Sequence, residues 1–337
     1  MKIAVDKTNY NLIKNDNNEY IYIFKDENIN DLLKTKLHCI RYDLIKNVDV
    51  NTSNYYIRCK KRAKITDDFE ELFKKRDYKL GIIVPNYNYE HTLEKCLKSI
   101  LNQTYQNFEI IFVDDVSTDK SVKIAKKLLK APHKIVELKQ KRYNGGARNE
   151  AYLHLSEDVD YIFAVDSDDW LYNENALEQI NDSLIGEPDV LFVGLAKCKY
   201  GVISKEKVPR YNDRYEALQG WSGVGKVIKK DLATRQECLY NEGTLKEDKN
   251  QHCRICIYMN DFKCLEDMIY VWNQDNAKST TTIRENIIWG TSTIRHYADT
   301  IQLYLSVKGQ DEIIDKLLEE RVRKCKEEVQ KGGDRQW

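Results

Sequence analysis

Three carboxylates stand directly after an apolar segment that is typical of a buried strand. Residues 161–165 are apolar and β-branched or aromatic, and Asp166, Asp168 and Asp169 follow them. In open α/β sheets, ligands bind beyond the carboxyl ends of the strands. Because such charge density is unfavourable without a cation, the cluster indicates a site for magnesium or manganese, shared with substrate phosphates. The alternative is a solvated turn or a helix N-cap, which Asp and Ser also favour.

Polar segments follow two other predicted strands, and a glycine-rich segment precedes a predicted helix. These segments are Pro85-Asn-Tyr-Asn88, Asp114-Asp-Val-Ser-Thr-Asp119 and Asn144-Gly-Gly-Ala-Arg-Asn149. Gly145 and Gly146 would let backbone N–H groups approach an anion at the helix N-terminus, and Arg148 would add a bidentate phosphate contact. Together with the acidic cluster, they predict a pocket for a nucleotide diphosphate.

Alternating strands and helices are predicted to position these groups. Strands are expected at 80–84, 108–113, 134–138, 161–165 and 190–193, and helices at 92–101, 121–129 and 147–155. This order predicts an α/β fold with a doubly wound, mainly parallel sheet flanked by helices.

The two ends of the chain have different patterns. Short strands at 20–24, 39–45 and 55–59, followed by a helix at 66–75, predict a small N-terminal β or α+β appendage. Helical spacing returns at 285–307 and 311–329. These C-terminal helices could support a homo-oligomer.

The composition excludes several classes of protein. Lys plus Arg and Asp plus Glu both total 54, so the chain lacks the basic excess that is typical of nucleic-acid binders. No apolar run reaches the ~20 residues of a membrane helix, and the first residues lack a signal-peptide pattern. Nine cysteines without a disulfide framework favour a reducing compartment. We therefore expect a cytoplasmic protein, free or peripheral at the inner face of the membrane.

The motifs, in this order and spacing, resemble those of family 2 glycosyltransferases with the GT-A fold. The matching elements are Ile82-Ile-Val-Pro-Asn-Tyr-Asn88, Leu97-Lys-Ser-Ile-Leu-Asn-Gln-Thr104, Phe108-Glu-Ile-Ile-Phe-Val-Asp-Asp115, Ser117-Thr-Asp119, Asn144-Gly-Gly-Ala-Arg-Asn149 and Asp166-Ser-Asp-Asp169. The resemblance implies three regions: an accessory region at 1–78, a GT-A domain at 79–282 and a C-terminal helical region at 283–337. Within the GT-A domain it implies a nucleotide-binding half at 79–200 and an acceptor half at 201–282.

The resemblance also assigns roles on the nucleotide side. Pro85 and Tyr87 would form the wall against the base and ribose, and Asp115 would accept a hydrogen bond from uracil N3. Arg148 would contact the pyrophosphate or the base. In the acidic cluster, Asp168 would be the main metal ligand and Asp166 would contact the ribose or the metal.

Asp169 would then orient the donor sugar or the metal shell. On the acceptor side, Trp221 and Lys226 belong to a glycine-rich version of the family's acceptor segment. Lys278 and Ser279 fall in a loop that resembles one closing over the donor.

A transferase also needs a base that takes the proton from the acceptor hydroxyl. Glu247 and Asp248 are the acidic pair that best matches the family. Asp248 is the preferred base, Glu247 the second choice and Glu242 the third. The alternative is an ordinary charged helix start, because acidic residues favour the first turn.

These assignments imply a metal-dependent, inverting glycosyltransferase. It would use Mn²⁺ or Mg²⁺ and transfer a sugar from a UDP-sugar to a hydroxyl of a glycan or glycolipid acceptor. One alternative is a sugar nucleotidyltransferase, although such enzymes normally carry a glycine-rich basic loop after the first strand. Another is a non-catalytic nucleotide-sugar-binding protein, against which the acidic cluster and the candidate base argue.

The cysteines near residue 253 leave a second interpretation open. His252, Cys253 and Cys256, with Cys238 and Cys264 nearby, could form a zinc site. Buried free cysteine is more commonly a small hydrophobic residue. His296 could be a further ligand, but a lone histidine is usually an ordinary core or surface residue.

Overall fold

The computed structural model describes residues 77–220, 224–243, 247–276, 286–306 and 312–333, together with five short N-terminal strands. These strands are β1 (Lys2–Ala4), β2 (Tyr10–Lys14), β3 (Tyr20–Phe24), β4 (Tyr55–Cys59) and β5 (Lys64–Thr66). Strands β2, β3 and β4 form an antiparallel sheet, and β1 pairs with β5 in parallel. The predicted strands at 20–24 and 55–59 are confirmed, whereas the strand predicted at 39–45 and residues 67–75 of the predicted helix lie outside the described residues.

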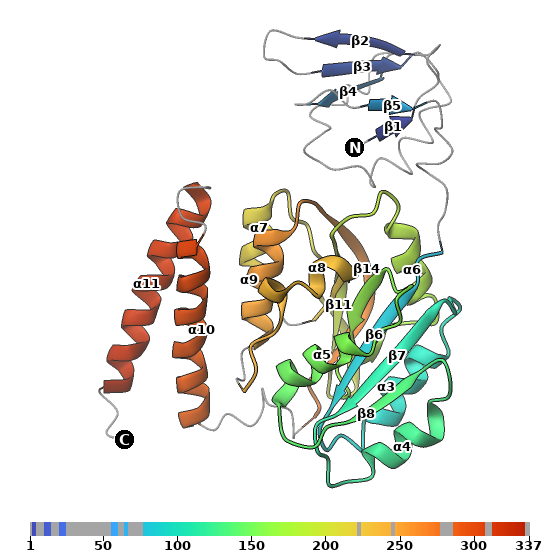
Figure 1. Cartoon of the computed structure of the whole chain (residues 1–337), viewed down its shortest axis with the longest axis vertical. Coiled ribbons are helices and arrows are strands. Elements are labelled where there is room, and N and C mark those ends of the chain that lie inside the picture. Colours follow the sequence, from blue (N-terminus) through green and yellow to red (C-terminus); the bar gives the residue numbers. More distant parts are fainter. Residues whose placement is uncertain are drawn as a thin grey trace.

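A nine-stranded sheet forms the centre of the molecule (Figure 1). Its strands are β6 (Leu80–Asn86), β7 (Phe108–Asp114), β8 (Lys134–Glu137), β9 (Tyr161–Ala164), β10 (Trp170–Leu171), β11 (Val190–Lys199), β12 (Val202–Lys207), β13 (Lys226–Lys229) and β14 (Phe262–Asn273). The strand order is β10-β14-β11-β13-β9-β6-β7-β8, with β12 paired to β11. Strands β9, β6, β7 and β8 run parallel to one another, as do β11 and β14, while β13 runs antiparallel between β9 and β11. The predicted mainly parallel α/β sheet is confirmed.

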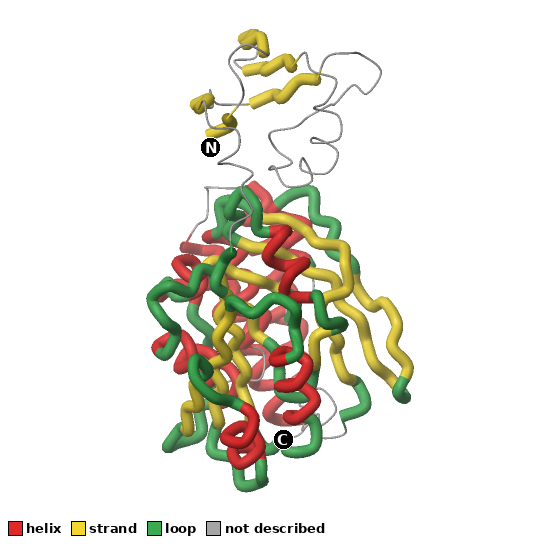
Figure 2. Tube along the Cα trace, turned by 90° about the vertical axis from the view of Figure 1, so that its right-hand side faces the viewer, coloured by secondary structure: helices red, strands yellow, loops and turns green. Residues whose placement is uncertain are grey.

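Helices cover both faces of this sheet (Figure 1, Figure 2). They are α3 (Leu93–Leu101), α4 (Ser121–Leu128), α5 (Tyr143–Leu153), α6 (Ala176–Ser183), α7 (Arg214–Gln219), α8 (Lys230–Ala233) and α9 (Glu247–Tyr258), with a 3₁₀ turn η3 (Gln236–Cys238). Side chains alternate between the faces of a strand. In β6, Ile82 therefore packs in the core with α3, α4 and α6, whereas Ile83 packs in the core with α5 and α9.

Helix α3 shows how the sequence pattern produces this packing. Its buried residues are Leu93, Cys96, Leu97 and Ile100, which recur at the spacing of one helical face. On its solvent side Lys98 and Glu94 form an ion pair of 2.7 Å, the i,i+4 arrangement that supports an exposed helix. The predicted helix at 92–101 is confirmed to within one residue.

The predicted start of the helix at 147–155 was wrong. Helix α5 begins at Tyr143, so Gly145 and Gly146 belong to its first turn and do not form a loop before it. A Cβ on Gly145 would lie 2.4 Å from the backbone oxygen of Asn241, which is closer than carbon and oxygen can approach. Glycine therefore permits α5 to pack against the chain that leads to α9, and its low helix propensity concealed the first turn in the sequence.

Two C-terminal helices, α10 (Asn286–Ser306) and α11 (Glu312–Gly333), lie side by side (Figure 1). Tyr304 of α10 is in the same buried cluster as Cys253 and Ile257 of α9. Asp299 of α10 also accepts hydrogen bonds from Asn241 at 2.5 Å and from Asn250 at 3.2 Å. Helix α10 therefore supports α9 directly. None of the helices in the described part of the chain is long and apolar enough to cross a membrane.

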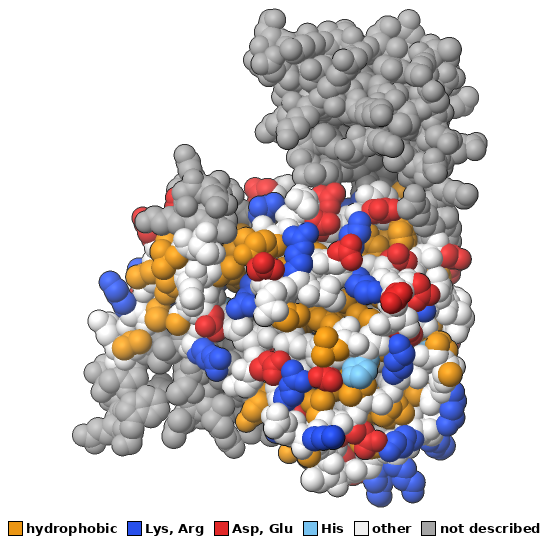
Figure 3. Space-filling model, viewed as in Figure 1, with side chains coloured by type: hydrophobic (Ala, Val, Ile, Leu, Met, Phe, Trp, Pro, Cys, Tyr) orange, Lys and Arg blue, Asp and Glu red, His pale blue; other side chains and the backbone are white. Residues whose placement is uncertain are grey.

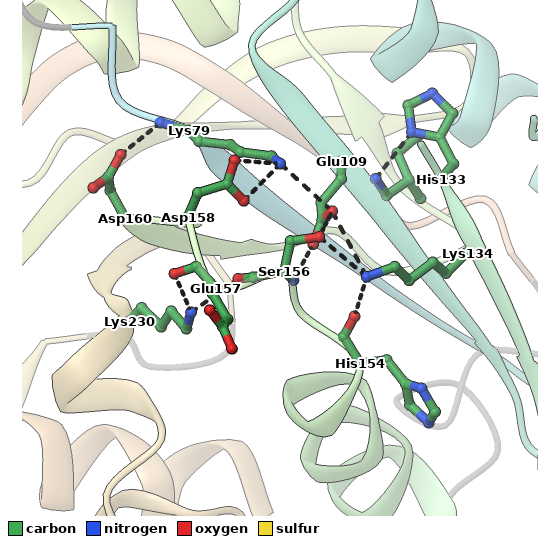
Figure 4. A network of polar contacts seen from close by, with 11 residues as sticks. Lys79, Glu109, His133, Lys134, His154, Ser156, Glu157, Asp158, Asp160 and Lys230 are labelled. Atoms are coloured by element: carbon green, nitrogen blue, oxygen red, sulfur yellow. Dashed lines mark hydrogen bonds and ion pairs between the residues drawn. The ribbon is translucent and has the colours of Figure 1, made fainter. Parts of the chain in front are cut away.

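A polar network links the strands at the edge of the sheet where β6, β7 and β9 begin (Figure 4). Glu109 of β7 is fully buried and accepts hydrogen bonds from the Ser156 amide at 2.7 Å and the Ser156 hydroxyl at 2.6 Å. The ammonium groups of Lys79 and Lys134 both lie 3.9 Å from the same carboxylate. The buried charge is thus paired and hydrogen-bonded, as a buried carboxylate requires. On the described surface, acidic and basic side chains are interspersed (Figure 3).

Candidate functional site

The carboxyl ends of β6, β7 and β9 meet at one edge of the sheet, because these strands are parallel neighbours. At this edge Asn86 donates a hydrogen bond of 2.9 Å to Asp114, which also accepts one of 2.8 Å from the Ser117 amide. The Ser167 hydroxyl donates to the carbonyl oxygen of Pro85 at 2.6 Å. These contacts hold the three polar segments that the sequence predicted to converge.

The predicted base site contains Tyr87 and Asp115. The Tyr87 side chain is exposed, whereas Pro85 is buried, so Tyr87 supplies the accessible part of the predicted wall. The buried Asp115 carboxylate accepts hydrogen bonds from the Arg142 amide at 2.7 Å and the Tyr143 amide at 2.8 Å. Each carboxylate oxygen can accept a second hydrogen bond, so Asp115 retains capacity for a donor on a nucleotide base.

The acidic cluster has three different environments. Asp166 forms an ion pair of 2.6 Å with Arg148. Asp168 accepts a hydrogen bond of 2.9 Å from Asn276. Burial, followed by the charge of Asp166, raises the pKa of Asp168 to about 6. Asp166 is thus paired with a guanidinium, whereas the Asp168 carboxylate has a neutral hydrogen-bond donor.

Asp169 faces the protein interior. One oxygen accepts from the Tyr270 hydroxyl at 2.5 Å and the other from the Asn273 amide at 2.8 Å. Burial, then the charges of Asp168 and Asp166, raise the pKa of Asp169 well above its usual range. Through these contacts to β14, Asp169 fixes the acidic loop, and its role in orienting the donor sugar or the metal shell stays a prediction.

The donor set fits a divalent metal that is shared with a substrate. Within the described ranges, no three His, Cys, Asp or Glu side chains gather as a complete protein ligand set. Magnesium sites in nucleotide enzymes commonly use one or two carboxylates and take their other ligands from phosphates and water. Burial and, next, the charge of Asp166 disfavour the ionised form of Asp168 and raise its pKa, and a bound cation would favour the ionised form. Asp168 is accordingly the main ligand candidate, with Asp166 beside it.

Arg148 lies between the acidic cluster and α9. Its side chain is almost fully buried, and its guanidinium carbon lies 5.1 Å from the centre of the Tyr240 ring. Besides Asp166, it approaches the Glu247 carboxylate at 3.8 Å. Among the described residues, its Nε and Nη1 have no hydrogen-bond partner. The guanidinium thus lies beside two protein carboxylates, and its contact with the pyrophosphate or the base stays a prediction.

The predicted catalytic pair stands at the start of α9. Glu247 is buried, while Asp248 is only partly buried and accepts a hydrogen bond of 2.8 Å from the Lys249 amide. Burial and, next, the charge of Asp248 raise the pKa of Glu247 above its usual range. The third candidate, Glu242, is paired with Arg142 at 2.6 Å. Asp248 is therefore more accessible than Glu247, whereas Glu242 is exposed but held by Arg142.

The acceptor side is described in part. Lys226 of β13 is buried beneath α9, where its ammonium group lies 3.3 Å from the Gln251 side-chain oxygen. Burial lowers its pKa to about 8, although Asp248 acts in the opposite direction. Trp221, Lys278 and Ser279 lie outside the described residues.

The cysteines near residue 253 are packed as core side chains. The Cys253 sulfur accepts from the Tyr304 hydroxyl at 3.8 Å, and the Cys256 sulfur lies 3.7 Å from a ring nitrogen of His252. Burial raises the pKa of Cys256 and lowers that of His252, which favours the neutral thiol over the thiolate that zinc binds. His296 is buried against Asn250, a contact that joins α10 to α9.

A lysine in the base site was missed by the sequence analysis. The Lys141 ammonium lies over the Tyr87 ring and 3.3 Å from Asp115. In the sequence Lys141 is one lysine in a basic stretch, and its contacts with Tyr87 and Asp115 can be recognised only in the folded structure.

A doubly wound, mainly parallel sheet with an acidic loop at one strand end is typical of the GT-A fold. The sequence profile of "Glycosyl transferase family 2" matches residues 81–254. The chain therefore belongs to glycosyl transferase family 2, which favours the glycosyltransferase hypothesis over the sugar nucleotidyltransferase.

Similar proteins support the assignment of family and fold. "Glycosyltransferase GlyA" of Streptococcus pneumoniae is 44% identical over 96 residues, 28% of this chain and 14% of that protein. "Poly(ribitol-phosphate) beta-glucosyltransferase" of Bacillus spizizenii is 36% identical over 200 residues, 58% of this chain and 29% of that protein. The chain thus spans less than a third of either relative.

Among solved structures, S. aureus TarS 1–349 in complex with UDP-GlcNAc has a TM-score of 0.60 and 21% identity. The match covers 72% of this chain and 71% of that one, and it shows that the two chains share a fold.

Proposed function

We propose that this chain transfers a sugar from a UDP-sugar to a hydroxyl of a glycan or glycolipid acceptor, with inversion at the anomeric carbon. The observation that carries the proposal is the row of contacts from Asp166 through Arg148 to Glu247. This row links the acidic loop, proposed to face the diphosphate, to the acidic pair, proposed to face the acceptor. The UDP-GlcNAc complex of TarS, a protein of the same fold, supports the choice of a UDP-sugar.

Asp248 is the proposed base. It takes the proton of the acceptor hydroxyl as the oxygen forms its bond to the anomeric carbon of the donor. The diphosphate leaves from the opposite face in the same displacement, which inverts the configuration. Because burial and the charge of Asp248 raise the pKa of Glu247, Glu247 holds its proton more strongly and leaves Asp248 as the accessible carboxylate.

Mn²⁺ or Mg²⁺ is the proposed cofactor, held by Asp168 with Asp166 adjacent. Such an ion would supply charge neutralisation for the departing diphosphate. Asp169 keeps the loop in place through Tyr270 and Asn273, so it acts on the metal site by positioning. Attachment at the inner face of the membrane and self-association through α10 and α11 remain predictions from the sequence.

Calorimetry tests the donor side of the proposal. UDP should bind more tightly with Mn²⁺ or Mg²⁺ present than with EDTA, and Asp168→Asn should remove this difference. UDP should also bind more tightly than CDP, by about 1–3 kcal/mol, because unprotonated cytosine N3 has no proton to donate to Asp115. Equal UDP affinity with and without EDTA would contradict the metal site, and tighter binding of CDP would contradict the role of Asp115.

A further inference from the structure

The base site contains a positive group in addition to Tyr87 and Asp115. Lys141, in the segment between β8 and α5, places its ammonium over the face of the Tyr87 ring. The same nitrogen lies 3.3 Å from the Asp115 carboxylate and 3.4 Å from the Asp115 carbonyl oxygen. The centre of the Tyr143 ring lies 5.8 Å from the same nitrogen. Lys141 is therefore held between aromatic rings and a carboxylate.

A uracil base would use the same two contacts, and this step depends on the proposed function. A base stacked on the Tyr87 face that Lys141 covers would meet the ammonium, and its N3–H would need the carboxylate that Lys141 approaches. The ammonium and the base cannot occupy one volume. We propose that Lys141 is a displaceable plug of the base site, which an arriving nucleotide must push aside and which returns as the nucleoside diphosphate product leaves.

The interactions that hold the Lys141 side chain are modest, so the side chain can be displaced. The side chain is one-third exposed, so its contacts are partly screened by water. Burial lowers the pKa of Lys141 while the charge of Asp115 opposes the change, which means that desolvation offsets part of the attraction. The long side chain can swing into solvent, whereas Asp115 keeps its bonds to the amides of Arg142 and Tyr143.

Removal of the plug should strengthen binding of the base. A cation–π contact and a partly exposed ion pair are each modest, so Lys141→Ala should raise the affinity roughly three- to tenfold. The probe is uridine, because a neutral nucleoside is insensitive to the loss of a positive charge that would weaken binding of UDP. Lys141→Arg, which keeps a cation able to stack on Tyr87, should bind uridine no more tightly than the wild type.

Titration of the full chain with uridine, followed by NMR or calorimetry, tests the inference. Lys139→Ala is the matched control, since Lys139 is an exposed neighbour in the same basic stretch, and it should leave uridine affinity unchanged. Unchanged or weaker uridine binding by Lys141→Ala would overturn the plug while leaving UDP binding by the wild type intact. If neither the wild type nor Lys141→Ala binds uridine or UDP, the base site itself and the proposed function also fall.

Discussion

The buried Lys226 predicts a pH-dependent difference in stability that can be measured directly. Burial lowers its pKa from 10.5 to about 8 in the folded protein. Between these values the unfolded chain holds a proton that the folded chain has released, so the contribution of Lys226 to stability rises with pH across this range. At roughly 1.4 kcal/mol per pH unit, the free energy of unfolding changes by about 3 kcal/mol over the whole range. Below the folded pKa, the cost of burying the charged group applies in full.

Lys226→Met removes the titrating group and keeps a side chain of similar length. The loss of the contact to Gln251 shifts the stability of the variant by an amount that does not depend on the protonation of Lys226. The free energy of unfolding of the variant minus that of the wild type should therefore fall by about 2 kcal/mol between pH 8 and pH 9.5. Titrating groups distant from Lys226 contribute equally to both proteins and cancel in the difference.

The assay is urea denaturation of both proteins at a series of pH values. Lys205→Met, at an exposed position of β12, serves as the control and should give a difference that does not change with pH. A constant difference for Lys226→Met over the same range would refute the reasoning, since it would mean that the folded protein leaves the proton affinity of Lys226 unaltered.

Two further substitutions test how the two edges of the sheet are built. Gly145→Ala would bring a Cβ to 2.4 Å from the Asn241 backbone oxygen, so the packing of α5 should be disturbed and stability lost by about 1–3 kcal/mol; an unchanged melting temperature would contradict this close approach. Glu109→Gln removes the buried charge that pairs with Lys79 and Lys134 and weakens the acceptor for Ser156, at a cost of about 1–3 kcal/mol. UDP affinity should be unaffected in Glu109→Gln, because the network lies at the opposite edge from the acidic cluster, and a large loss of affinity would show that the edges are coupled.

The sequence predicted the strands that are continuous apolar runs. The segments at 80–84 and 108–113 stand out because both faces of the sheet are covered, so every side chain in them is buried. Strand β13 was not predicted, since its four residues follow a glycine-rich segment and both begin and end with a lysine. Strand β14 was also not predicted. Charged residues interrupt its first half, which is partly exposed, and its pairing with β11 shifts register.

The sequence also predicted which acidic residues gather at the site, because the order of motifs fixes which strand ends carry them. It could not predict the partners of each group. The buried position of Arg148 between Asp166 and Glu247 joins residues almost 100 positions apart. The plug formed by Lys141 likewise depends on the path of a loop. Such contacts follow from tertiary packing, which local patterns do not encode.

The most direct test of the account is the turnover of Asp248→Asn, measured as release of UDP from an accepted UDP-sugar with its acceptor, or by slow donor hydrolysis as a surrogate. The amide keeps the shape of the side chain but cannot take a proton at neutral pH. Turnover should fall by ~10² or more, while UDP-sugar affinity should change little because Asp248 is proposed to contact the acceptor. A loss of turnover in Glu247→Gln alone would move the base by one residue. Near-normal turnover in both variants would contradict the proposed catalytic pair.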